Sequence, residues 1–89
     1  MPIIYLTSHL RRVGPSGPTR VEAATLGAAL DAYFATAPMV RSYIVDDQGR
    51  LRKHVAVFID GELLVNKTDL GRGVTPESEI YVMQALSGG

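Results

Sequence analysis

The sequence has no cysteine among its 89 residues. This absence excludes disulfide bridges, thiolate metal sites and a cysteine nucleophile. Net charge is also missing, because nine basic and nine acidic side chains cancel to a formal charge of zero at pH 7. A chain with no overall field has no general attraction for a polyanion, so we do not expect nucleic acid as a partner.

Long apolar runs are absent as well. No stretch approaches the roughly 20 apolar residues that cross a bilayer. The amino end lacks the basic start, apolar run and small-residue cleavage site of a secretory signal. We therefore expect a soluble cytoplasmic protein without a membrane partner. Hydrophobic residues make up 46% of the chain, which is ordinary for one packed domain, and a domain this small has little room for a deep active site.

The first half of the chain predicts a hairpin and then a helix. Residues 2–13 and 19–23 resemble two strands on either side of a turn rich in glycine and proline. Residues 25–37 carry one apolar stripe at helical spacing and are the one main helix that we expect. Thr25 can cap the start of this helix, and Pro38 is expected to end it.

The second half predicts strands only. Two strand-like runs, 55–59 and 62–65, flank the pair Asp60-Gly61, which is typical of a type I′ hairpin. Residues 80–83 form the expected last strand. The result is an α+β roll, a mixed sheet of about four or five strands with one main helix. Because one helix covers only one sheet face, the other face stays open to water or to a partner.

Catalytic and ligand-binding motifs are weak. The segment from Gly14 to Pro18 lacks the Gly-Lys-Ser/Thr ending of a phosphate loop. Asp46 and Asp47 are interpreted as solvated turn formers, because no calcium-loop spacing follows them. His9 and His54 are not spaced to form a catalytic or zinc unit. We expect no metal site and no catalytic residue in this chain.

A short basic run leaves two interpretations open. It could dock to an acidic partner surface, or it could be a solvated strand edge whose charges prevent aggregation. The residues concerned are Arg41, Arg50, Arg52, Lys53 and His54.

The carboxyl end is different, because residues 85–89 read Ala-Leu-Ser-Gly-Gly. Terminal glycines do not contribute stability, since ordering glycine costs entropy. Because they have no side chains, they form instead a slender tail that can extend away from the domain. A narrow channel in another protein could admit such a tail and bring the unhindered Gly89 carboxylate to a reactive phosphate. We expect residues 1–84 to form the domain and residues 85–89 a flexible extended tail.

A small roll with one helix that ends in a strand and then Gly-Gly resembles the β-grasp, ubiquitin-like sulfur carriers of the MoaD/ThiS type. These include the small subunit of molybdopterin synthase, the thiamine-pathway carrier and the cysteine-pathway carrier. The resemblance covers most of the chain and is best from Gly49 to the end. Residues 49–62 look like the strand and hairpin of the family, and residues 77–83 look like its entry to the last strand.

The resemblance implies a carrier, not an enzyme. A ubiquitin-activating-like adenylyltransferase would use ATP and magnesium to adenylate the Gly89 carboxylate, and a sulfur donor protein would convert it to a thiocarboxylate for a downstream synthase subunit. The chain itself would bind no cofactor. Leu86, Ser87 and Gly88 would thread into the partner. Molybdopterin, thiamine, cysteine, tRNA thiolation and secondary metabolism all remain open as pathways.

Recognition would fall to the open sheet face. If Val57 and Val82 point inward, a period of two sends Phe58, Tyr81 and Met83 outward. An exposed cluster of aromatic and methionine side chains is typical of a protein interface. In the opposite register these three residues would lie in the core.

Two other functions use the same sequence. A ubiquitin-like modifier would join Gly89 to a lysine amine of a target protein. A passive interaction domain would make no use of the tail. Whether Gly89 is the natural terminus, or is exposed by removal of further residues, also stays open.

Overall fold

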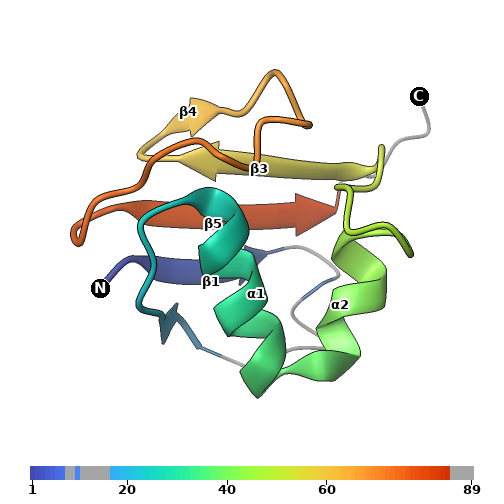
Figure 1. The fold of residues 1–89 in the computed structure, drawn as a ribbon, viewed down its shortest axis with the longest axis horizontal. Helices are drawn as coiled ribbons and strands as arrows, with labels where there is room; N and C mark the ends of the chain where they lie inside the picture. The colour runs from blue at the N-terminus through green and yellow to red at the C-terminus, as the bar shows by residue number, and fades with distance from the viewer. Residues whose placement is uncertain (8–9, 11–16, 85–89) are drawn as a thin grey trace.

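The structure is a computed structural model that describes residues 1–7, 10 and 17–84. In chain order its elements are β1 (Ile3–Thr7), β2 (Thr19–Arg20), α1 (Leu26–Thr36), α2 (Pro38–Ile44), β3 (Val55–Ile59), β4 (Glu62–Leu63) and β5 (Glu79–Gln84). The strands form one sheet in the order β2-β1-β5-β3-β4. This arrangement places the first and the last long strand side by side at its centre (Figure 1).

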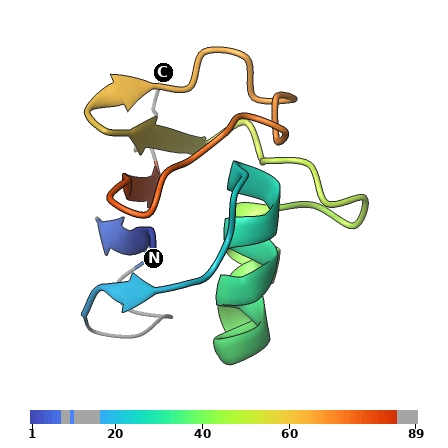
Figure 2. The same cartoon turned by 60° about the vertical axis from the view of Figure 1, so that its left-hand side comes forward.

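The sheet is mixed. Strands β1 and β5 run parallel, and the other neighbouring pairs are antiparallel. Figure 2 shows the sheet on one side of the molecule and both helices on the other. The predicted α+β roll with one open sheet face is therefore confirmed.

The core lies between the sheet and the helices. Strands β1, β3 and β5 bury every second residue, as a sheet covered on one face requires. The helices supply the apolar stripes that pack against them. The fully buried residues with the largest side chains include Tyr33, Ile4, Leu26, Ile44 and Ile80.

The first helix forms as predicted. Thr25 has an extended backbone, and its Oγ1 accepts a hydrogen bond from the N–H of Ala28 at 3.2 Å, which satisfies one free donor of the first turn. Ala37 ends the helix. The buried positions follow the predicted stripe, including Leu30 and Phe34.

The second helix, α2, was not predicted. Pro38 was expected only to stop α1, but it also occupies the first turn of α2, where a missing N–H is not needed. This helix spans 7 residues and buries only Val40 and Ile44, too few to form a recognisable stripe. No helix within the described ranges is long and apolar enough to cross a membrane.

The predicted hairpin is also confirmed. Asp60 and Gly61 have φ angles of 52° and 85°, the left-handed values that a type I′ turn needs at both positions. Strand β4 ends at Leu63, two residues earlier than predicted. Likewise, β2 is shorter than the predicted strand at 19–23.

Candidate functional site

A row of large side chains crosses four strands on the open face of the sheet. The register pairs Tyr5 with Tyr81, Tyr81 with Phe58, and Phe58 with Leu63. Residues paired in this way point to the same side of a sheet. On β1, β3 and β5 the residues that flank Tyr5, Phe58 and Tyr81 are buried under the helices, so this row faces away from the helices.

A second row lies two residues further along, towards the end of β5. It pairs Thr7 with Met83 and Met83 with Ala56. Met83 therefore extends the apolar surface towards Gln84, the last residue of β5. We call the five large residues of both rows, Tyr5, Phe58, Leu63, Tyr81 and Met83, the sheet patch.

The two tyrosines form the centre of the sheet patch. Their rings stack with centroids 4.5 Å apart and an interplanar angle of 7°. Burial raises the pKa of Tyr81, and the nearby Glu79 carboxylate raises it further. The Tyr81 phenol therefore stays neutral at physiological pH.

The structure brings the three residues of the predicted docking surface together. Phe58, Tyr81 and Met83 are half-buried on the open face, and Val57 and Val82 lie in the core. The opposite register, with the bulky residues inside, is therefore wrong. Docking itself stays a prediction.

Sequence reasoning missed Tyr5 and Leu63. Tyr5 stands between two buried residues, Ile4 and Leu6, so the alternation within this strand could have placed it on the open face. Leu63 is 49% exposed at the end of a strand of two residues. Such a short strand gives no alternation to analyse.

The predicted tail lies outside the described residues. The residues that the structure does not describe include Leu86, Ser87, Gly88 and Gly89. They also include His9 and most of the segment from Gly14 to Pro18. Their roles stay predictions. The structure does describe the strand that precedes the tail: β5 is paired with β1 as far as Met83 and with β3 as far as Gln84.

The basic run shapes the connection between α2 and β3. The Asp46 carboxylate accepts hydrogen bonds from the N–H groups of Gln48 and Arg50, and it also pairs with the Arg50 guanidinium at 3.3 Å. These contacts hold the pKa of Asp46 below its usual value, chiefly through the Arg50 N–H. Arg52 donates to the carbonyl of Ser42 at 2.7 Å. The basic run is thus exposed, but it lies before β3 and not on a strand edge.

Other candidate ligands remain scattered. Asp47 and His54 are exposed in the same connection. Within the part of the chain that the structure describes, no three histidine or acidic side chains come together as metal ligands would. The sheet patch, by contrast, includes Tyr81 and Met83 of β5, the strand that leads to the tail.

Similarity to known proteins agrees with this fold. No protein-family model matches the chain. The chain is 32% identical over 87 residues to small archaeal modifier protein 1 of Haloferax volcanii, and the match covers 94% of this chain and 95% of that protein. A crystal structure of the same Haloferax protein superposes with a TM-score of 0.85 and 31% identity over 99% of this chain and 98% of its own.

Two more distant structures share the fold. A chain of the BexX/CysO complex of Amycolatopsis orientalis has a TM-score of 0.84 at 17% identity, with full coverage of both chains. CysO of Mycobacterium tuberculosis has a TM-score of 0.80 at 15% identity, covering 97% of this chain and 100% of that one. The chain belongs to the family of small archaeal modifier protein 1, among the ubiquitin-like β-grasp sulfur carriers of the MoaD/ThiS type.

Proposed function

We propose that this chain is a cytoplasmic sulfur carrier whose Gly89 carboxylate is adenylated and then converted to a thiocarboxylate. One observation carries the proposal. Two residues of the sheet patch, Tyr81 and Met83, lie on β5, the strand that continues in sequence into Ala-Leu-Ser-Gly-Gly, so a partner bound there is close to the start of the tail. Membership of a family of small ubiquitin-like carriers and modifiers supports it.

The chemistry needs no acid or base from this chain. An oxygen of the Gly89 carboxylate attacks the α-phosphorus of ATP in the activating enzyme, and pyrophosphate leaves. Sulfur from a donor then attacks the acyl carbon, the bond to the AMP oxygen breaks, and AMP departs with the electron pair. If the donor is a persulfide, a thiol next cleaves the S–S bond of the acyl disulfide, which leaves the thiocarboxylate and a disulfide.

The residues of the chain position and present the tail. The sheet patch would dock onto the adenylyltransferase, which holds ATP and magnesium. Gly88, Ser87 and Leu86 would pass through its channel, where side chains larger than these would be obstructed. A downstream synthase subunit would then consume the thiocarboxylate.

A second candidate function is conjugation. The similar protein from Haloferax volcanii is named a modifier. In that case a lysine amine of a target attacks the acyl adenylate in place of sulfur, an amide forms and AMP leaves. The same tail and the same sheet patch serve both reactions.

Intact-protein mass spectrometry distinguishes the candidates. The chain is isolated from a host that supplies the activating enzyme and the sulfur donor, beside a variant that lacks Gly89. We expect a species in which one carboxyl oxygen has become sulfur, and its loss in the truncated variant. A Gly89 carboxylate that is always free would favour the passive domain, and one found only in amides with lysine would favour the modifier.

The docking role of the sheet patch needs a matched pair of variants. Met83→Glu places a charge within the sheet patch, and Val65→Glu places the same charge at a residue that is 86% exposed outside it. We expect the first variant to lose the sulfur-containing species and the second to keep it. Equal yields from both variants would argue against docking at the sheet patch.

A further inference from the structure

A lysine amine is held beside the residue at which the tail begins. Lysine occurs in this chain only as Lys53 and Lys67. The Lys67 amine donates a hydrogen bond to the carbonyl of Arg52, which also accepts from the N–H of Val55 at 3.0 Å. Val55 is paired with Gln84, the last residue of β5. The start of β3 lies beside the end of β5 (Figure 1), so the Lys67 amine lies at the end of the sheet that leads to the tail.

The loop that carries Lys67 is itself ordered by hydrogen bonds. The Asn66 Oδ1 accepts from the N–H of Thr68 at 3.1 Å and from the Thr68 hydroxyl at 2.6 Å. The carbonyl of Asn66 accepts from the N–H of Asp69 at 3.0 Å. The backbone of Lys67 is therefore held by this turn, and the far end of its side chain is held by the carbonyl of Arg52.

The surroundings of Lys67 favour the free amine. The side chain is half-buried, and burial lowers the pKa of its amine, because desolvation disfavours the charged ammonium. At a given pH a larger fraction of this amine is therefore neutral than in a fully solvated lysine. A neutral amine can keep one N–H on the Arg52 carbonyl while its lone pair stays free to attack an acyl carbon.

The tail is long enough to reach this amine. The contacts above place the Lys67 amine at most about 13 Å from the Cα of Gln84, since paired Cα atoms of antiparallel strands are about 5 Å apart. Residues 85–89 span up to about 17 Å when extended. The Gly89 carboxyl can therefore meet the Lys67 amine without any change in the sheet.

The other amines of the chain are less well placed. Met1 precedes β1, which begins beside Glu79 at the opposite end of β5. Lys53 follows Arg52 and is also near the start of the tail, but its side chain is exposed. An exposed lysine must lose its rotamer freedom when it attacks, whereas the hydrogen bond to Arg52 already orders Lys67.

We propose that Lys67 is a self-conjugation site, at which the activated Gly89 carboxyl of the same chain forms an isopeptide bond. This step rests on the proposed function, which supplies the acyl adenylate. When the adenylate leaves the activating enzyme before sulfur arrives, the neutral Lys67 amine attacks the acyl carbon and a C–N bond forms. The bond to the AMP oxygen breaks, AMP departs with the electron pair, and the amine proton passes to water.

Self-conjugation closes the tail into a loop. Because the amine and the acyl group belong to one chain, their effective concentration is on the order of millimolar, which favours this reaction over capture by a dilute target protein. The looped tail has no free carboxylate and cannot enter the channel of a partner. The reaction therefore withdraws activated carrier when the sulfur donor is scarce.

A Gly89 thioester tests the acceptor without the activating enzyme. A small thiol releases the chain from an intein fusion and activates Gly89 alone, and the absence of cysteine prevents internal thioester exchange. The wild type is compared with Lys67→Arg and with the matched control Lys53→Arg at mildly alkaline pH. Arginine keeps the charge and can donate to the same carbonyl, but it stays protonated and does not attack the thioester.

We expect the wild type and Lys53→Arg to give a species one water lighter than the hydrolysed chain, at a rate independent of protein concentration. Peptide mapping should locate the new bond at Lys67. In Lys67→Arg the light species should form about tenfold more slowly, which is the advantage expected for a lysine side chain that is ordered in advance. A bond chiefly at Lys53, a product that joins two chains, or hydrolysis alone would each overturn the proposal.

The activating enzyme separates failure of this proposal from failure of the proposed function. The chain is incubated with the enzyme and ATP, first without and then with the sulfur donor, and pyrophosphate release reports adenylation. If no pyrophosphate is released, the sulfur-carrier function is wrong, and the thioester still decides whether Lys67 is the acceptor. If it is released, we expect the light species to accumulate without donor and to decline with it. Pyrophosphate release without the light species would refute self-conjugation.

Discussion

Tyr5 and Tyr81 lie opposite each other on two parallel strands, and their rings stack with centroids 4.5 Å apart. These two residues belong to the first and last long strands of the described chain. The stack therefore joins segments that are far apart in sequence at the centre of the open sheet face.

This stack should contribute measurable coupling. We expect a double-mutant cycle with Tyr5→Leu and Tyr81→Leu, followed by urea denaturation, to give a coupling free energy of about 0.5–1.5 kcal/mol. Tyr43, which is 46% exposed on α2, provides the control. A cycle of Tyr43→Leu with Tyr81→Leu should give no coupling, and a zero value for the stacked pair would contradict the prediction.

Tyr33 should make stability depend on alkaline pH. Burial raises its pKa from 10.0 to about 12, and its hydroxyl has no hydrogen-bond partner within the described residues. Above pH 10 the unfolded chain loses this proton before the folded protein does, so the free energy of unfolding falls as pH rises towards 12. Two pKa units correspond to a loss on the order of 3 kcal/mol.

The variant Tyr33→Phe isolates this effect. At pH 7 its stability should equal or exceed that of the wild type by up to about 1 kcal/mol, because a buried hydroxyl without a partner is removed. Between pH 10 and 12 it should become increasingly more stable than the wild type in urea denaturation. Parallel pH profiles for the two proteins would show that Tyr33 does not titrate in this way.

Asp60 should be more important than its exposure suggests. Its Oδ1 accepts from the N–H of Glu79 at 2.9 Å and its Oδ2 accepts from the Ser78 hydroxyl at 3.2 Å, so the hairpin turn is joined to the start of β5. Its φ of 52° also disfavours most residues. We expect Asp60→Ala to cost about 2 kcal/mol of stability and Asp60→Asn less than about 1 kcal/mol. If thermal or urea unfolding gave similar losses of stability for Asp60→Ala and Asp60→Asn, the result would contradict this explanation.

Gly27→Ala should destabilise the protein although alanine favours helices. The N–H of Gly27 donates to the carbonyl of Leu70 at 2.8 Å, and an added Cβ would lie 3.1 Å from the same oxygen. The displaced loop should outweigh the propensity gain of about 1 kcal/mol, for a net loss of about 1 kcal/mol. Gly71→Ala, where nothing lies within 4 Å, should change stability much less. A more stable Gly27→Ala variant would sink this prediction.

Local signals predicted much of the fold. The cap at Thr25, the hairpin at Asp60-Gly61 and the alternation in β3 and β5 all depend on residues that are close in sequence. Because alternation assigns side chains to faces, the outward positions of Phe58 and Tyr81 could also be predicted.

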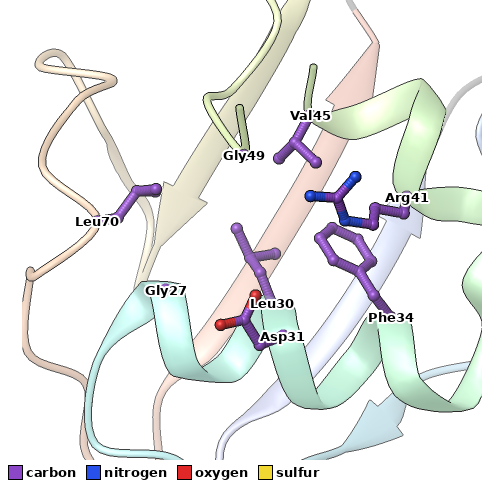
Figure 3. Close-up of a pocket in the computed structure, with 8 residues that line it drawn as sticks. All are labelled: Gly27, Leu30, Asp31, Phe34, Arg41, Val45, Gly49 and Leu70. Carbon is purple, nitrogen blue, oxygen red and sulfur yellow. The ribbon is translucent and has the colours of Figure 1, made fainter. Parts of the chain in front are cut away.

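What the sequence did not predict depends on pairing at a distance or on ambiguous residues. Pro38 is equally compatible with the end of one helix and the start of the next. The partner of Tyr5 is set by a parallel pairing of the first strand with the last, and nothing near Tyr5 specifies it. One pocket takes its lining from four segments of the chain, which contribute Gly27, Arg41, Gly49 and Leu70 among others (Figure 3), so no single stretch of sequence outlines it.

The parallel pairing of β1 with β5 also determines how the protein resists mechanical force. Their register runs from Ile3 opposite Glu79 to Thr7 opposite Met83. A pull applied between Pro2 and Gln84 acts at opposite ends of this pair and loads its hydrogen bonds in shear, so they must break together. A motor that pulls on the tail while the amino end is held therefore has to break the β1–β5 hydrogen bonds together. Strand β4 is held at the edge of the sheet by two residue pairs, which can separate one after the other.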